Sequence, residues 1–129
     1  MPYIEAKLSI KLDENQKNEL QAKLANAVSS AFSKPNAYIM TNIEDEKSLY
    51  MGGAKVEKGA YIVVRALGSV AKPSCQNATK EICATLANDY GLNGSNIYVS
   101  AGKLLEVAQK DKMRIIQYCL KKDIEYNKR

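Results

Sequence analysis

The residue types that most often carry nucleophilic or acid-base chemistry are sparse in this chain of 129 residues. It contains no histidine, and its three cysteines, Cys75, Cys83 and Cys119, show neither CxxC spacing nor an even count. This pattern argues against a zinc site, a Ser-His or Cys-His nucleophile and a disulfide framework, and it predicts neither a metal nor a cofactor. Any proton transfer is therefore expected from carboxylates, lysines, tyrosines or a chain terminus.

The composition is typical of one soluble globular domain. Hydrophobic residues make up 46% of the chain and charged residues 26%, with only 7 Gly and 3 Pro. No run approaches the roughly 18 apolar residues that a membrane span needs, and the first residues lack the basic start and apolar core of a signal peptide. We therefore expect a cytoplasmic protein, with export that needs no signal peptide as the alternative.

The first third of the chain predicts a strand, a helix and a second strand. Residues 4–12 alternate between apolar and polar side chains, which is the pattern of a strand with one buried face. Asp13 and Gln16 then form a predicted capping box, and a helical apolar stripe follows until Pro35 ends it. Residues 37–43 are β-prone.

The same order returns further along the chain. Residues 60–67 predict a strand, Pro73 or Ser74 opens a helix that Gly91 ends, and residues 96–100 predict a last strand. A short strand over residues 48–51 lies between the two units.

Aligning Pro2 with Ala60 superposes the two units with a period near 58, which indicates a duplicated βαβ unit. Because βαβ crossovers are right-handed, both helices are expected on one face of a shared four-stranded sheet. The predicted fold class is α+β with a mixed sheet. Residues 60–67 and 97–101 read as apolar on both sides, so the second face should also be covered, most economically by other copies of the chain.

The end of the chain differs in charge from the rest. Residues 103–129 hold 8 Lys and Arg against 4 Asp and Glu. They also carry an apolar stripe at helical spacing: Leu105, Ala108, Met113, Ile116, Leu120 and Ile124. We therefore expect a domain over residues 1–102 and a helical extension over residues 103–129 packed on it. A nucleic-acid-binding role for the basic tail is a third functional hypothesis, less favoured than a solvated helix face.

Several short motifs occur in a consistent order around this duplicated unit. They are Pro2, Ser33-Lys34-Pro35 with Tyr38-Ile39-Met40, Met51-Gly52-Gly53, Ala66-Leu67-Gly68 and Asn96-Ile97-Tyr98-Val99. Together they resemble the macrophage migration inhibitory factor family of the tautomerase superfamily, over about residues 2–101. The resemblance implies a homotrimer whose sheets form a central barrel, with a keto-enol tautomerase pocket at each subunit boundary.

The resemblance also implies a catalytic base, the secondary amine of Pro2 after removal of Met1. A general base works best with a pKa near the operating pH, whereas an amine is ordinarily too basic. Partial burial and a nearby Lys34 cation would both lower the pKa of that amine. The same lysine could bind a substrate carboxylate and stabilise the developing enolate.

The substrate-binding residues implied by the resemblance are Lys34, Tyr38, Leu67, Tyr98 and Ser100. Tyr38 and Tyr98 would form pocket walls, with Tyr98 contributed by a neighbouring subunit, and Leu67 would line the pocket. Ser100 stands where many relatives have Asn, so a hydrogen bond from it to substrate would have a shorter reach.

The chain departs from the family at two places. Residues 54–60 contain no cysteine, so no thiol-disulfide role carries over. The chain also has no Trp and only one Phe, Phe32, where relatives place aromatic residues near the pocket at their C-termini. The expected activity is tautomerisation of small aromatic α-keto acids such as phenylpyruvate, or of dopachrome-like compounds. The alternative is a catalytically weak, cytokine-like protein that binds a cell-surface receptor.

Overall fold

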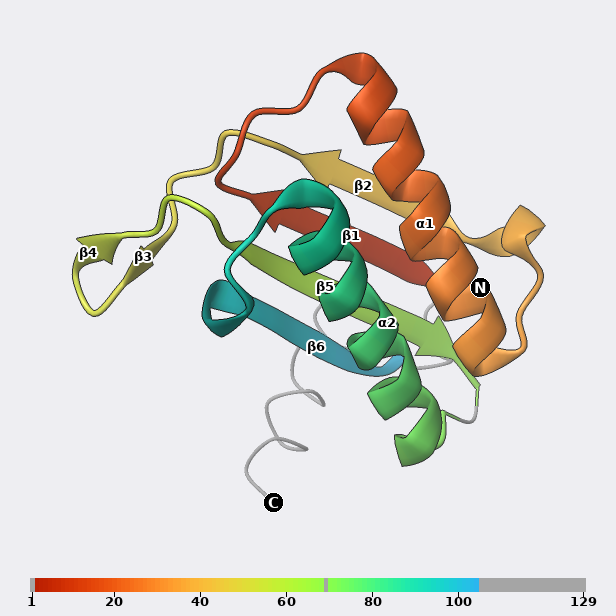
Figure 1. The fold of residues 1–129 in the computed structure, drawn as a ribbon. Coiled ribbons are helices and arrows are strands. Elements are labelled where there is room, and N and C mark those ends of the chain that lie inside the picture. The colour runs from red at the N-terminus through yellow and green to blue at the C-terminus, as the bar shows by residue number, and fades with distance from the viewer. Residues whose placement is uncertain (1, 69, 105–129) are drawn as a thin grey trace, which may run out of the picture.

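The computed structural model describes residues 2–68 and 70–104, and two βαβ units account for most of them (Figure 1). The first unit consists of β1 (Tyr3–Leu8), α1 (Glu14–Phe32) and β2 (Met40–Glu44). The second consists of β5 (Ala60–Leu67), α2 (Lys72–Tyr90) and β6 (Ile97–Leu104). Shorter elements join them: the 3-10 turns η1 (Asn36–Tyr38) and η2 (Gly94–Asn96), and the hairpin strands β3 (Tyr50–Met51) and β4 (Ala54–Lys55).

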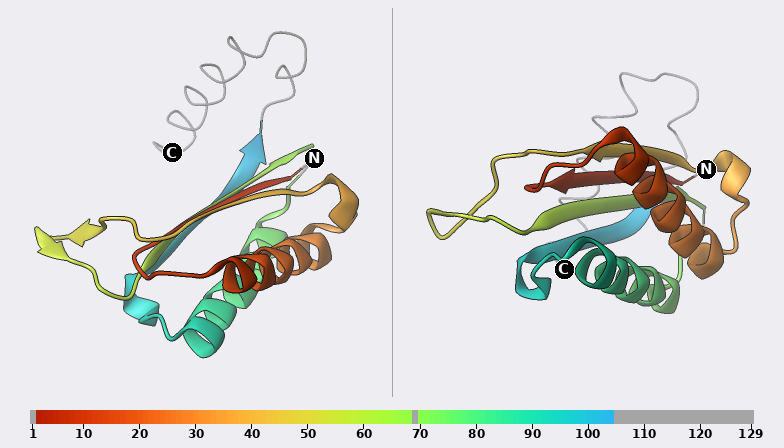
Figure 2. Two further views of the ribbon diagram at one scale, coloured as in Figure 1. Left: turned by 90° about the horizontal axis from the view of Figure 1, so that it is seen from above. Right: turned by 45° about the horizontal axis from the view of Figure 1, so that its top comes forward.

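The four long strands form one mixed sheet in the order β2-β1-β5-β6. β1 pairs with β2 and β5 with β6 in parallel, whereas the central strands β1 and β5 are antiparallel. Both helices lie side by side on one face of this sheet, and the β3–β4 hairpin reaches out beyond its end (Figures 1 and 2). The predicted fold, a duplicated βαβ unit with two helices on one face, is confirmed.

The sequence period of 58 is also visible in the strand register. β1 pairs with β5 through Tyr3↔Arg65 and Lys7↔Tyr61. Shifting Tyr3 and Lys7 by 58 positions gives Tyr61 and Arg65, so each pair maps onto the other. The starts of α1 and α2, at residues 14 and 72, differ by the same 58. The two units are therefore related by an approximate two-fold axis that passes between β1 and β5.

The core lies between the helices and the inward face of the sheet. The strand side chains are buried at every second position, as the alternation predicts. The largest fully buried aliphatic side chains are Ile4, Leu8, Leu20, Leu24, Val28, Ile62, Val64, Ile82 and Leu86. Full burial of each such side chain stabilises the fold by about 1.5–3 kcal/mol, so this layer holds the sheet and helices together.

The first strand is shorter than its alternating sequence predicts. It ends at Leu8 rather than near residue 12, because β5 begins at Ala60, directly opposite Leu8, and offers no further antiparallel partner. The chain then bends away, and the Leu12 amide donates to Asp45 Oδ2 at 2.9 Å. Leu12 is still buried, so the alternation correctly predicted its burial but not its strand pairing.

The helix ends follow their local signals. Asp13 and Gln16 form the predicted capping box at the start of α1, and Ser33 ends that helix with φ 53°. α2 carries Pro73 in its first turn and ends at Gly91, where φ is 69°. Glycine adopts this left-handed conformation without the steric cost that other residues incur.

The outward face of the sheet is less apolar than predicted. Tyr61, Val63, Arg65 and Leu67 alternate along β5 on this face, so a cation interrupts the apolar row.

β6 continues to Leu104, past the expected boundary at residue 102, and the predicted helix over the tail lies outside the described residues. Within the described ranges, no helix is long and apolar enough to cross a bilayer.

Candidate functional site

Pro2 lies at the head of a central strand of the sheet. Its side chain is fully buried, and its carbonyl oxygen accepts a hydrogen bond of 3.1 Å from the Met40 amide at the start of β2. A proline donates no backbone hydrogen bond and is therefore tolerated at the first position before a strand. The pairing of its neighbour, Tyr3↔Arg65, places Pro2 beside the end of β5.

Lys34 lies in the connection between α1 and β2. Its amide donates to the Ser29 carbonyl at 3.2 Å, and its own carbonyl accepts from Ser29 Oγ at 2.5 Å. These two bonds fix the backbone after the left-handed Ser33, and the chain then runs through η1 to Met40, beside Pro2. The Lys34 side chain is half-buried, and in the described part of the chain no carboxylate lies within ion-pair distance of it.

Two further predicted site residues lie at the same end of the sheet. Tyr38 belongs to η1 and is 66% exposed, and Leu67 is the last residue of β5. Met40, next to Pro2, is 68% exposed, although the sequence analysis placed it only in a motif and not among the site residues. Pro2, Lys34, Tyr38 and Leu67 thus lie at one edge of the molecule, with the exposed side chain of Met40 beside them.

Tyr98 and Ser100 lie elsewhere in the same subunit. Tyr98 pairs with Tyr61, which in turn pairs with Lys7, four residues beyond Tyr3 on β1. This register separates Tyr98 from Pro2 by about 17 Å along the strands and about 10 Å across them. Tyr98 therefore cannot form a common pocket with Pro2 of its own chain.

Arg65 binds Ser100, one of the expected substrate-binding residues, and the sequence analysis did not single it out. Its Nη2 donates to Ser100 Oγ at 3.2 Å, and its Nη1 donates to the Ser100 carbonyl at 3.2 Å. The only signal in the sequence is a lone arginine inside the apolar run of residues 60–67. Ser100 is thus held by an intrachain cation on the outward face.

Tyr3, the residue after Pro2, belongs to a polar group on the outward face. Its hydroxyl donates to Glu5 Oε1 at 3.3 Å and accepts from Asn42 Nδ2 at 3.5 Å. Burial is the main cause that raises the pKa of Tyr3, and the nearby Glu5 and Glu44 carboxylates raise it further. Tyr3 therefore stays protonated at neutral pH and is not a candidate base.

The start of the second βαβ unit is packed against neighbouring segments of the fold. Ala60 is the counterpart of Pro2 under the 58-residue shift, and the chain before it packs against Ser9 and the turn before β6. The Gly59 amide donates to Ser9 Oγ at 2.9 Å, and the Asn93 amide donates to the Lys58 carbonyl at 3.0 Å. The chain before Ala60 therefore closes the start of β5, whereas the start of β1 is held at Pro2 by the bond from the Met40 amide.

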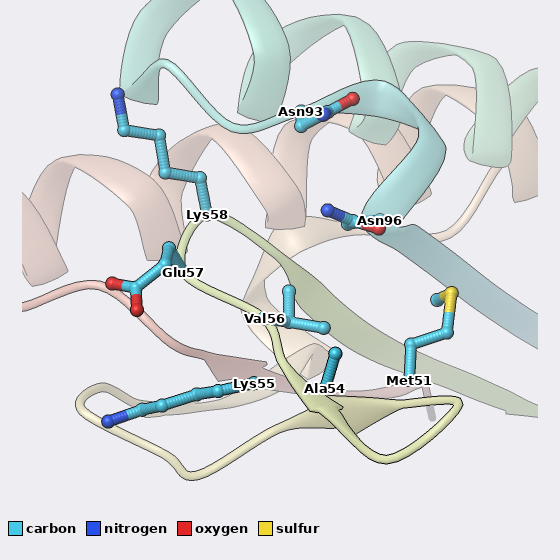
Figure 3. A pocket seen from close by; sticks show the side chains of 8 residues that line it. All are labelled: Met51, Ala54, Lys55, Val56, Glu57, Lys58, Asn93 and Asn96. Atoms are coloured by element: carbon cyan, nitrogen blue, oxygen red, sulfur yellow. The ribbon is translucent and has the colours of Figure 1, made fainter.

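Two surface hollows formed by described residues lie away from Pro2. One, of about 620 Å³, lies over the outer surface of α1 and α2, and the other, of about 490 Å³, lies between the β3–β4 hairpin and η2 (Figure 3). No group of three or more His, Cys, Asp or Glu side chains in the described ranges could hold a metal ion.

Comparison with known proteins identifies relatives with this architecture. The family profile of macrophage migration inhibitory factor (MIF) matches residues 1–110. MIF2 of Leishmania major is 25% identical, with a TM-score of 0.70 over 80% of this chain and 88% of its own. The macrophage migration inhibitory factor-like protein of Entamoeba histolytica is 22% identical, with a TM-score of 0.73 over 84% and 91%. Pt0534, solved after inactivation by 2-oxo-3-pentynoate, is 16% identical, with a TM-score of 0.70 over 78% and 84%. No curated protein sequence matches the chain.

Proposed function

Because the chain belongs to the macrophage migration inhibitory factor family, within the tautomerase superfamily, we propose that it is a keto-enol tautomerase whose general base is Pro2. The observation that carries the proposal is the position of Pro2: buried, at the head of a central strand, at the same edge as Lys34, Tyr38 and Leu67. Small aromatic α-keto acids such as phenylpyruvate are the proposed substrates.

The chemistry requires a neutral secondary amine. Removal of Met1 converts the Pro2 nitrogen from an amide, which cannot accept a proton, into an amine. Burial disfavours the charged ammonium and lowers the pKa of such an amine toward neutrality. The neutral nitrogen then takes a proton from the carbon beside the keto group, and the electron pair moves onto the keto oxygen. That oxygen takes a proton from solvent, and Pro2 returns its own proton to solvent, so the product is the enol isomer.

Lys34 is the proposed anchor for the substrate carboxylate. It has no carboxylate partner among the described residues, so its charge is available to a ligand. The same cation stabilises negative charge that develops on the keto oxygen, and this contribution is larger in a site that excludes water. Tyr38 and Leu67 supply apolar surface for the aryl group.

A homotrimer completes the proposed pocket. Tyr98 lies far from Pro2 within one subunit but is 52% exposed, so a neighbouring subunit can place its Tyr98 against the Pro2 edge. Contacts between opposite ends of identical subunits are heterologous, and they close into a trimeric ring when each contact rotates the next subunit by about 120°. Light scattering coupled to size exclusion is expected to give the mass of three chains, and a monomer at micromolar concentration would contradict the shared pocket.

The catalytic role of Pro2 is tested by replacing it. Pro2→Gly is expected to lower phenylpyruvate tautomerisation by about 10²-fold or more, because general-base catalysis contributes about 10²–10⁴-fold. The rate of the wild type should rise with pH as the amine loses its proton. Pro73→Gly, at an exposed proline in the first turn of α2, is the matched control and should keep its turnover. Intact mass must first show that Met1 is absent.

Covalent capture gives a second readout that does not depend on turnover. Incubation with 2-oxo-3-pentynoate, the reagent that inactivated Pt0534, is expected to add one molecule per chain, mapped to Pro2 by peptide mass. Unchanged turnover in Pro2→Gly, with Met1 removed, would exclude Pro2 as the base. A wild type that lacks both Pro2-dependent turnover and the adduct would favour the receptor-binding alternative.

A further inference from the structure

The large exposed apolar side chains of the described residues occupy two places on the molecule. Tyr38 and Met40 lie beside Pro2. The others lie toward the opposite end of the sheet, on the hairpin and on the outward face: Tyr50, Met51, Tyr61 and Tyr98. The second group includes Tyr98, which the proposed trimer places in the pocket of a neighbouring subunit.

Two side chains neighbour Tyr98 on this surface: the thioether of Met51 and the aromatic ring of Tyr61. Its hydroxyl donates to Met51 Sδ at 4.0 Å, and the strand register places Tyr61 directly beside it on the same face. A thioether is a weak acceptor but a polarizable surface that favours contact with aromatic rings. The Tyr61 side chain therefore restricts the Tyr98 ring on one side, and the Met51 thioether contacts the Tyr98 hydroxyl.

The hairpin holds Met51 in this position. Met51 pairs with Ala54 across a turn formed by Gly52 and Gly53, both with positive φ. The base of the hairpin is tied down by the Val56 amide, which donates to the Leu49 carbonyl at 2.8 Å. Because side chains alternate along a strand, the neighbouring Tyr50 projects to the opposite side of the hairpin.

Met51 lines the hollow between the β3–β4 hairpin and η2. In Figure 3 the Met51 side chain rises from the hairpin toward Asn96, whereas Lys55 and Lys58 extend away from the hollow. The charged groups of this rim are thus not directed at a common ligand. Met51 is 41% exposed and borders open space, so truncating it removes a contact with Tyr98 without cutting into the core.

We propose that Met51 is a positioning residue for Tyr98 and thereby favours substrates that carry an aryl group. The proposal rests on the proposed function, since it concerns the Tyr98 that enters the neighbouring subunit's pocket. With its hydroxyl held by Met51, the Tyr98 ring presents a fixed face to the aryl group. Without that contact, binding of the substrate must immobilise Tyr98, at a cost of about 2- to 10-fold in affinity.

The test compares Met51→Ala, Met51→Leu and Tyr98→Phe with the wild type on phenylpyruvate and on 2-oxobutanoate, which lacks the aryl group. Met51→Ala is expected to raise KM for phenylpyruvate by about 2- to 10-fold, with kcat within about twofold and little change for 2-oxobutanoate. Met51→Leu, which keeps most of the volume, should recover part of this loss. In the Tyr98→Phe background, Met51→Ala should raise KM for phenylpyruvate by a smaller factor than it does in the wild type.

Tyr50→Ala is the matched control, because it removes an exposed apolar side chain (65% against 41% for Met51) from the same hairpin on the side away from Tyr98. A KM for Met51→Ala no higher than that of Tyr50→Ala, in an enzyme with Pro2-dependent turnover, would overturn the role of Met51 and leave the proposed function intact. If the wild type shows no such turnover, the proposed function fails instead. The contact itself is then tested with methyl-13C methionine labels, where an unmoved Met51 resonance in Tyr98→Phe would refute it.

Discussion

Gly59 is the residue whose replacement should most clearly test how the second βαβ unit is closed. It is buried immediately before β5, and its amide donates to Ser9 Oγ at 2.9 Å. A Cβ at this position would clash with Cγ1 of Val56 and would lie 2.8 Å from the backbone carbonyl oxygen of Asn96. The need for glycine here comes from the close approach of two backbone segments.

The expected cost of Gly59→Ala follows from these two contacts. The Val56 methyl can rotate away, but the Asn96 carbonyl belongs to the backbone where η2 meets β6, and moving it displaces the first residues of that strand. Overpacking of this kind costs about 1–3 kcal/mol, and a backbone contact points to the upper half of that range. A loss of about 1.5–3 kcal/mol corresponds to a melting temperature lower by about 6–12 °C for a chain of this size.

Urea unfolding and thermal melting, followed by circular dichroism, would measure this loss. Gly94→Ala is the control, since a Cβ there meets nothing within 4 Å, and it should stay within about 0.5 kcal/mol of the wild type. Adding Val56→Ala to Gly59→Ala should recover only part of the loss, because the Asn96 carbonyl clash remains. Equal stabilities of Gly59→Ala and Gly94→Ala would refute the close packing of residues 56–59 against η2.

Two further predictions concern residues at the start of α1 and at the end of β2. Asp13→Ala removes both the side-chain cap and its capping box with Gln16, so the free energy of unfolding in urea should fall by about 0.5–2 kcal/mol, whereas Asn15→Ala in the same turn should change it little. The Asp45 carboxylate accepts from the Leu12 amide, and this bond, followed by the Lys17 ammonium, holds the pKa of Asp45 below its usual range. A lowered pKa contributes stability above the unfolded-state pKa of about 3.9 and loses it as the pH falls further. Melting temperatures of Asp45→Asn should therefore fall less between pH 4 and pH 2 than those of the wild type, and parallel curves would contradict this reasoning.

Local patterns in the sequence determined the elements and the faces that they bury. The alternation of residues 4–12 and the Asp13 capping box depend on side chains within a few positions of one another, and the 58-residue period is the recurrence of such local patterns. The same patterns correctly predicted the burial of Leu12 even though the strand ended earlier. Pro2 and Lys34 are predicted site residues only through the family resemblance, since neither residue type signals catalysis by itself.

Only the tertiary structure decided which of these residues lie together. β1 ends at Leu8 because its partner β5 starts at residue 60, about 50 positions away, where no local pattern carries information. The same long-range register separates Tyr98 from Pro2 and places Arg65 on the Ser100 hydroxyl. Met51 meets Tyr98 across 47 positions for the same reason. Side-chain periodicity specifies a face within one element, whereas strand register and close backbone approaches depend on how distant segments pack against a shared core.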